Sequence, residues 1–288
     1  MRRRPFSPGP DFMVLTFVGS LLTTSLAGLV TETLLDKSAQ ALTLEERVAR
    51  ETQALLAGLG WQEPTDAAVC GPADLLARHS GAQLLVAARP FSLPLPTGLL
   101  EGGAPAEGAT PAARVVAEEL ARYPEGFLDS AGLERVVLCA GLREAGEPIP
   151  SLPNYRATLL IDVDAPAPFL RRLVHHEVFH FLDFADDLHV TSDAEWSMLN
   201  EPGFRYGAGG RSVRDPAASL LTSDMPGFLT RYATAAVEED KAELFAFLMT
   251  APREVGRRAE RDAVLGKKVA LLEARLGDSF EGLGAGLW

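Results

Sequence analysis

One apolar segment that contains three histidines constrains the fold of this chain most strongly. Residues 173–182 read Leu-Val-His-His-Glu-Val-Phe-His-Phe-Leu, so polar groups are framed on both sides by large apolar side chains. Such a frame is typical of a buried helix, which we expect over Ala167–Phe184. Burying imidazoles beside a carboxylate is costly unless a partner offsets their desolvation, and a cation does so. The segment therefore predicts a core helix that carries a metal site.

The polar residues of this segment form the motif His-Glu-x-x-His. His176 and His180 stand four positions apart, so both side chains lie on one face of a helix and can bind one metal ion. Glu177 is one position round the helix and can reach a water molecule on that ion as a general base. Two imidazoles, one carboxylate and one open position suit Zn²⁺. We therefore expect a catalytic zinc that needs a third protein ligand.

Two acidic residues are candidates for that third ligand. Asp186 follows His180 by six positions, a spacing used by one class of such enzymes after a chain-turning glycine, but position 183 holds Asp183. Glu239 and Glu243 lie four apart on a helix expected over Ala233–Met249. There, one carboxylate would bind the metal and the other would accept the far N–H of a ligating histidine.

The two motifs together resemble the gluzincin metallopeptidases. His176 to Asp183 reads His-Glu-x-x-His-x-x-Asp. Later in the chain, Tyr232 is followed by Glu239 seven positions on and by Glu243 four positions after that, which is similar to the second motif of this family. The match is closest to the catalytic domain of anthrax lethal factor and its small bacterial relatives, and it covers about Leu133–Met249.

This resemblance implies a role for each matching residue. It implies that His176, His180 and Glu239 bind Zn²⁺, that Glu177 is the general base, and that Tyr232 donates to the oxyanion. Glu243 would accept a hydrogen bond from a ligating histidine. Apart from the resemblance, Asp183 is expected either to accept a hydrogen bond from His180 or to cap a neighbouring element.

The pattern of expected elements indicates an α+β fold, with a zincin-like catalytic domain over residues 68–280. Strands are expected at Ala82–Ala88, Arg135–Cys139 and Thr158–Val163, because short runs of β-branched and apolar residues are flanked by turn residues. Phe91–Thr110 is rich in proline and glycine and is expected to be a loop. Ala185–Gly227 is expected to be irregular, and a last helix is expected over Arg253–Leu276.

The amino end has the order of an export signal. Three arginines at 2–4 precede the apolar run Met13–Leu22 and the small residues before Gly28. Residues 1–27 are therefore expected to be a signal peptide or an uncleaved membrane anchor, followed by a helical extension over residues 28–67. The expected location is extracytoplasmic, with membrane contact only through such an anchor.

Composition narrows the possible partners. The formal net charge of -12 argues against nucleic acid, whose backbone is bound through lysine and arginine. The two cysteines, Cys70 and Cys139, match no zinc or redox motif, and are expected to be two buried thiols or, in an exported chain, one disulfide.

The function we expect is zinc-dependent hydrolysis of a peptide or protein substrate. Two alternatives remain open from sequence: a non-catalytic zinc-stabilised module that binds a peptide or cell-wall partner, and a metal-dependent amidase acting on a non-peptide amide. The aromatic and glycine-rich segment Trp196–Gly210 is expected to be either a substrate wall or lid, or a hydrophobic cluster under a long loop.

Overall fold

The computed structural model describes residues 54, 57–105, 109–153, 157–187, 192–213 and 215–279. The expected signal or anchor at residues 1–27 lies outside these ranges, as does most of the expected extension at 28–67. Within them, none of the helices combines the length and the apolar character that a bilayer crossing requires.

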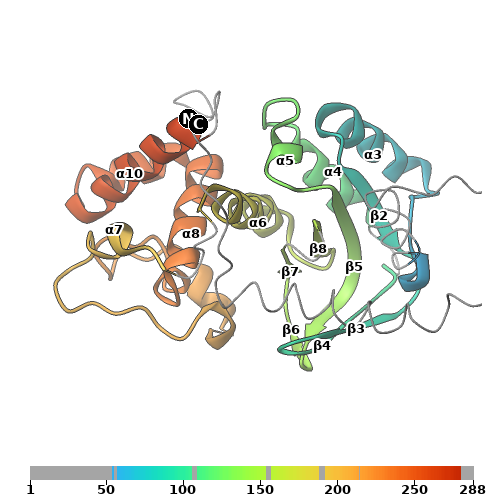
Figure 1. The fold of residues 1–288 in the computed structure, drawn as a ribbon, viewed down its shortest axis with the longest axis horizontal. Coiled ribbons are helices and arrows are strands. Elements are labelled where there is room, and N and C mark those ends of the chain that lie inside the picture. The colour runs from blue at the N-terminus through green and yellow to red at the C-terminus, as the bar shows by residue number, and fades with distance from the viewer. Residues whose placement is uncertain are drawn as a thin grey trace, which may run out of the picture.

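A mixed sheet forms one side of the molecule (Figure 1). Its strands are β1 (Trp61–Gln62), β2 (Gln83–Ala87), β3 (Phe91–Leu95), β4 (Gly98–Gly103), β5 (Arg135–Glu144), β6 (Glu147–Pro148), β7 (Ser151–Leu152) and β8 (Thr158–Asp162). The long strand β5 is central, because β2 and β8 pair with its first half in parallel and β4 pairs with its second half antiparallel. The short strand β7 pairs antiparallel with β8.

The helices are α3 (Ala67–Ser80), α4 (Ala109–Leu120), α5 (Phe127–Ser130), α6 (Ala167–Asp187), α7 (Ala194–Ser197), α8 (Val237–Thr250), α9 (Pro252–Ala259) and α10 (Ala263–Ser279). Short 3-10 turns occur at η2 (Gly210–Ser212), η3 (Pro216–Ser219) and η4 (Tyr232–Thr234). Helix α6 packs against α4 on one side and α8 on the other, and it lies at the centre of the view in Figure 1.

Side chains at alternate positions of the strands lie on opposite faces of the sheet, and they divide the core into two clusters. Leu84, Val136 and Leu159 pack in the larger cluster with the helices, whereas their neighbours Leu85, Val137 and Leu160 pack in a smaller cluster on the other side. This period of two is expected of strands buried on both faces. Helix α6 contributes to the larger cluster with Val174, Val178 and Phe181, for example, so the metal-site helix belongs to the main core.

The structure confirms the mixed helix and sheet composition expected of an α+β fold, and the three expected strands. It contradicts the loop expected at Phe91–Thr110, which forms the hairpin β3–β4 and the start of α4. Pro94 is tolerated because β3 is an edge strand paired only with β4. Gly98 has a φ of 137°, which suits glycine at the hairpin turn.

Several expected boundaries also differ. The helix expected over Ala233–Met249 is interrupted at Ala236, whose backbone is extended, so α8 begins only at Val237. The helix expected over Arg253–Leu276 is two helices, since Asp262 accepts from the backbone N–H groups of Val264 and Leu265 at the start of α10. The segment expected to be irregular over Ala185–Gly227 contains the end of α6, the short helix α7 and two 3-10 turns.

Two further findings concern strand β1, at one end of the sheet, and the state of the two cysteines. Strand β1 falls in the region assigned to the helical extension, and it pairs with β2 while Trp61 is buried in the smaller cluster. Both cysteines are free thiols, with Cys139 buried and Cys70 partly buried. The disulfide alternative is therefore wrong.

Candidate metal centre

Helix α6 presents the two histidines of the motif to α8. His176 and Glu177 are buried, with 6% and 5% of their surface exposed, and His180 is partly buried one turn later. Glu239, in the first turn of α8, lies opposite them. His176, His180 and Glu239 each offer one ligand atom, and these three atoms lie within 4.8 Å of one another. The group can hold a metal ion.

The distances between these atoms suit a small tetrahedral cation. Nε2 of His176 lies 3.2 Å from Nε2 of His180 and 3.0 Å from Oε2 of Glu239, and His180 Nε2 lies 3.6 Å from the same oxygen. Zinc–ligand bonds of about 2.0–2.1 Å at tetrahedral angles separate neighbouring ligand atoms by about 3.3 Å. Two imidazoles and a carboxylate at such spacing are compatible with a tetrahedral divalent ion.

Glu243, one turn after Glu239, accepts a hydrogen bond from the ring nitrogen of His176 that faces away from Glu239. Its Oε1 lies 3.1 Å from Nδ1 of His176, and because a carboxylate only accepts, His176 donates through Nδ1–H and directs Nε2 toward Glu239 and His180. The other oxygen of Glu243 accepts from the Thr230 hydroxyl at 2.7 Å. Thr230 Oγ1 in turn accepts from the backbone N–H of Ala233 at 3.1 Å. Both oxygens of this buried carboxylate are therefore fixed in place.

The carboxylates make the ligand group strongly basic. Burial lowers the pKa of His176, but its hydrogen bonds to Glu239 and Glu243 outweigh burial and raise that pKa to about 10. Burial likewise opposes the charge on Glu239, but hydrogen bonds from His176 and His180 hold its pKa well below the usual range. Without a metal, a proton on His176 is the cation that these carboxylates stabilise. A divalent ion in the same place can replace that proton.

Glu177 has one fixed oxygen and one unsatisfied oxygen. The hydroxyl of Ser151 in β7 donates to Oε1 of Glu177 at 2.6 Å. Across the part of the chain that the structure describes, the buried Oε2 of Glu177 has no hydrogen-bond partner. The charge of Glu177 acts on both His176 and Tyr232, which places it at the metal centre. A buried carboxylate oxygen without a partner is costly and marks a position for a water molecule or a substrate proton.

Tyr232 also lies beside His176. Its ring centroid is 5.9 Å from that of His176. Burial, followed by the charges of Glu239 and Glu177, raises the pKa of Tyr232 well above its usual range. The hydroxyl therefore stays protonated and can donate a hydrogen bond.

A glycine segment lies directly against these groups. A Cβ atom at Gly210 would lie 2.1 Å from Oε1 of Glu239 and 2.4 Å from the hydroxyl oxygen of Tyr232. The segment is held by the backbone N–H groups of Gly207 and Gly209, which donate to the carbonyls of Thr234 and Ala235 at 2.9 Å each. A side chain at position 210 would therefore displace the carboxylate of Glu239 and the hydroxyl of Tyr232.

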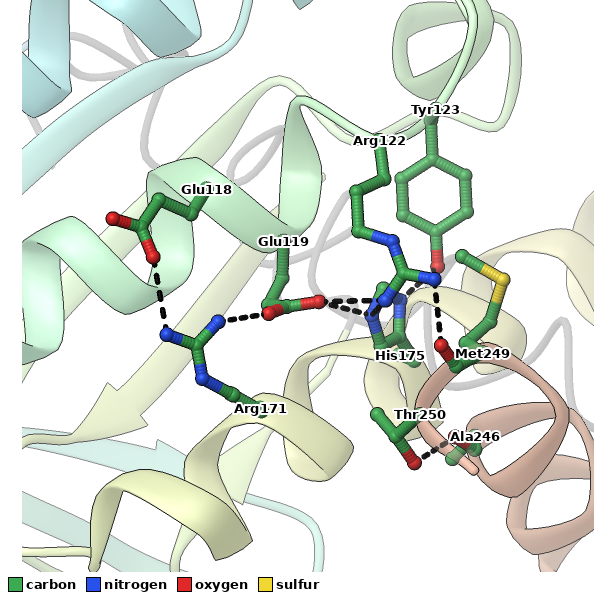
Figure 2. A network of polar contacts seen from close by, with 9 residues as sticks. All are labelled: Glu118, Glu119, Arg122, Tyr123, Arg171, His175, Ala246, Met249 and Thr250. Carbon is green, nitrogen blue, oxygen red and sulfur yellow. Dashed lines mark hydrogen bonds and ion pairs between the residues drawn. The ribbon is translucent and has the colours of Figure 1, made fainter. Parts of the chain in front are cut away.

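His175, the residue before His176, belongs to a separate polar network (Figure 2). Its Nε2 lies 2.9 Å from Oε2 of Glu119, and its Nδ1 lies 2.7 Å from the hydroxyl of Tyr123. Arg122 and Arg171 also donate to Glu119. Burial lowers the pKa of His175, so it is neutral and donates to Glu119 while it accepts from Tyr123. Because His175 is locked to α4, the rotation of α6 that presents His176 is also fixed.

The remaining sequence candidates are placed as follows. Oδ1 of Asp183 accepts from Lys241 of α8 at 2.6 Å, so Asp183 joins the two metal-site helices. Asp186 lies in the last turn of α6, and its side chain is outside the described part. In the segment Trp196–Gly210, Trp196 and Tyr206 both donate to Asp240, and Phe204 packs on Tyr206 and Phe228. These aromatic residues form a cluster beside the centre.

Sequence reasoning missed two residues that shape the centre, Ser151 and Thr230. Each comes from a segment between expected elements, and no local pattern marks it. Gly210 belongs to the candidate segment Trp196–Gly210, but its contact with Glu239 could not be read from sequence. Comparison with known proteins finds no matching family model, no matching curated protein and no matching solved structure.

Proposed function

We propose that the protein hydrolyses peptide bonds with a Zn²⁺ ion held by His176, His180 and Glu239. When bound, zinc lowers the pKa of a water molecule in its open position toward about 7 and polarises a substrate carbonyl. The support is the donor set of the centre and its spacing, which suit zinc.

The observation that carries a catalytic function is the unsatisfied oxygen of Glu177. A zinc site that only stabilises a fold needs no base beside its ligands. Here Ser151 fixes one oxygen of Glu177, and the other can take a proton from the attacking water and pass it to the leaving amine.

The other residues of the centre stabilise the charge that develops on the substrate or hold the ligands in position. The protonated hydroxyl of Tyr232 donates to the oxyanion that develops on the carbonyl, a contribution typically worth about 3 to 4 kcal/mol of the barrier. Glu243 keeps His176 in the tautomer that offers Nε2. Asp183 and Lys241 hold α6 against α8.

The test is cleavage profiling on an unbiased peptide mixture. Zinc-loaded protein is expected to cut peptides, a chelator to stop the cutting, and added zinc to restore it. A protein that binds one zinc per chain and cuts no peptide in the mixture would contradict the proposal. Release of ammonia or amine only from non-peptide amides would support an amidase instead.

A further inference from the structure

The candidate ligands of the metal centre have little contact with solvent. The side chains of His176, His180 and Glu239 are only 7%, 14% and 12% exposed. A substrate carbonyl would have to reach both the metal and the hydroxyl of Tyr232, but here that hydroxyl donates a hydrogen bond to Glu239. Part of the cover over the centre therefore has to move before a substrate can bind.

Residues 207–212, which we call the strap, are the part of this cover that can move at the lowest cost. A Cβ atom at Gly210 would lie 2.1 Å from Oε1 of Glu239 and 2.4 Å from the hydroxyl oxygen of Tyr232, so the strap touches the centre. Helices α6 and α8, which carry the ligands, belong to the main core, whereas no residue of the strap is fully buried. Three of its six residues are glycine, whose backbone angles change easily.

The strap is attached on both sides of its contact with the centre. At its start, two of its glycines donate backbone hydrogen bonds to the carbonyls where η4 ends. At its other end, Nη2 of Arg211 lies 2.9 Å from Oε1 of Glu144, the last residue of β5. The strap therefore runs from the turn before α8 to the sheet, and Gly210 lies between these two attachments.

The ion pair between Arg211 and Glu144 is the attachment that can be released. Arg211 is the only charged residue of the strap, and its side chain is half exposed, whereas that of Glu144 is buried. The hydroxyl of Thr97 donates to the same oxygen of Glu144 and fixes the carboxylate. Because a buried carboxylate is costly without a positive partner, Glu144 favours the strap position in which Arg211 reaches it. A pair with one partner in water is also weak enough to break and form again.

We propose that the strap is a gate over the metal centre, closed by the ion pair between Arg211 and Glu144, and that it opens to admit a metal ion or a substrate. The inference rests on the proposed function for its substrate, but the metal alone tests it. The strap contributes no member of the ligand group, so its open and closed states bind the ion equally well, while only the open state exchanges it. A gate therefore changes the rates of metal binding and release by the same factor and leaves the affinity unchanged.

The experiment measures zinc exchange by stopped flow. Zinc binding to the metal-free protein is followed in competition with a chromophoric chelator, and release into excess chelator gives the dissociation rate. Arg211→Gln removes the positive charge of the pair, Glu144→Gln removes the negative charge, and a third variant carries both changes. Arg205→Gln is the matched control, because it removes the same charge from an exposed position just before the strap.

Arg211→Gln, Glu144→Gln and the double variant are each expected to bind and release zinc about fivefold faster than the unmodified chain, with unchanged affinity. The double variant is expected to match the single ones, because all three remove the same interaction. Arg205→Gln is expected to match the unmodified chain. If Glu144→Gln does not fold, the two arginine variants decide the result, since both side chains lie at the surface.

Unchanged exchange rates in Arg211→Gln would overturn the gate. A lower zinc affinity with an unchanged association rate would also overturn it, because the pair would then support the geometry of the ligands instead of controlling access to them. Equal acceleration by Arg205→Gln would assign the effect to net charge and would likewise overturn the gate.

Peptide cleavage by the same preparations separates this inference from the proposed function. Faster zinc exchange in Arg211→Gln without any cutting keeps the gate and overturns the peptidase. Chelator-sensitive cutting with unchanged zinc exchange keeps the peptidase and overturns the gate. If both hold, kcat/KM for peptides is expected to rise about fivefold in Arg211→Gln, because only the open fraction takes a substrate. An unchanged kcat/KM would overturn the role of the strap in substrate access.

Discussion

Three glutamates belong to the metal centre, and their hydrogen-bond partners give each a different chemistry. Glu239 faces two imidazoles, so it stays charged and offers an oxygen to a cation. Glu243 has both oxygens engaged, so it only positions His176. Glu177 has one oxygen engaged and one available, as a proton carrier needs. The residue type alone decides none of these roles.

The first prediction concerns the ligand set. Glu239→Ala, His176→Ala and His180→Ala are each expected to lose most bound zinc, because a three-ligand site does not tolerate the loss of one. Glu238→Ala is the matched control, since it removes the neighbouring carboxylate, and is expected to keep about one zinc per chain. Metal content after gel filtration measures this. Retention of zinc by Glu239→Ala together with its loss from Asp186→Asn would move the third ligand to Asp186.

The second prediction concerns Glu243. Glu243→Ala is expected to weaken zinc binding about 10- to 100-fold, because His176 loses the acceptor that fixes its tautomer. Competition with a chelator of known affinity measures the change. An unchanged affinity would mean that the packing of α6 alone orients the imidazole.

The third prediction concerns proton transfer. Glu177→Gln keeps the shape of the side chain and is expected to keep zinc, but to lose peptide cleavage by several orders of magnitude. Ser151→Ala is expected to lower the rate by about tenfold, because it only frees Oε1 of Glu177 to move. Zinc content and rate are measured on the same samples. Equal rates for Glu177→Gln and the unmodified chain would place the base elsewhere.

How much of the centre the sequence predicts depends on how local its signals are. His176, Glu177 and His180 are fixed by helical spacing, and Glu239 and Glu243 by the same spacing on a second helix. Ser151 and Thr230 meet Glu177 and Glu243 only because separate segments fold over them, and hydroxyls in turns carry no such signature. Asp183 shows the same limit, since its partner Lys241 is 58 positions away.

At the scale of elements, the break between η4 and α8 has the largest effect on the geometry of the metal centre. Ala236 is extended, so Tyr232 and Glu239 belong to different turns and approach His176 from different directions. The alanines at 233, 235 and 236 favour a helix, but the backbone of Ala236 is extended in the folded chain. The hairpin β3–β4 was missed for a related reason: proline and glycine suggest a loop, although Phe91 and Leu93 are buried and Ser92 and Pro94 are exposed, as in an edge strand.

The fourth prediction concerns the glycine segment over the centre. Gly210→Ala is expected to reduce both zinc affinity and cleavage, because its Cβ would lie 2.1 Å from Oε1 of Glu239. Gly71→Ala in α3 is the control, since a Cβ there meets nothing within 4 Å, and is expected to leave both unchanged. Zinc competition and cleavage rates on both variants measure this. Normal zinc affinity in Gly210→Ala would mean that the segment moves away at little cost.

At the scale of the whole molecule, buried charges join helices that are distant in sequence. Lys268 of α10 is fully buried and donates to Asp240 of α8, which also accepts from Trp196 and Tyr206. The network of Glu119 and His175 joins α4 to α6, and Arg122 extends it to α8 by donating to the carbonyl of Met249 at 2.6 Å (Figure 2). Composition gives no sign of such pairs, because a charged residue in a sequence is most often exposed.

The last prediction is the effect of pH on stability through Glu119. Burial opposes its charge, but hydrogen bonds from His175, Arg122 and Arg171 prevail and lower its pKa from 4.5 to about 2. The folded state therefore binds fewer protons than the unfolded state. The contribution of Glu119 to stability is complete above about pH 5 and is lost as pH falls toward 2. The lowered pKa of His175 acts with the same sign below its ordinary value of 6.5.

Glu119→Gln keeps an acceptor for His175 but removes the charge. It is expected to lower the free energy of unfolding by about 2 kcal/mol at pH 7, and the difference from the unmodified chain is expected to shrink by about half near pH 3. Glu118→Gln is the matched control, because Glu118 pairs with the same Arg171 but is 46% exposed, where water screens the pair. Urea unfolding of the three proteins at both pH values measures this. A difference between Glu119→Gln and the unmodified chain that is constant with pH would show that Glu119 acts by packing, since only a charged group that protonates on unfolding makes the difference depend on pH.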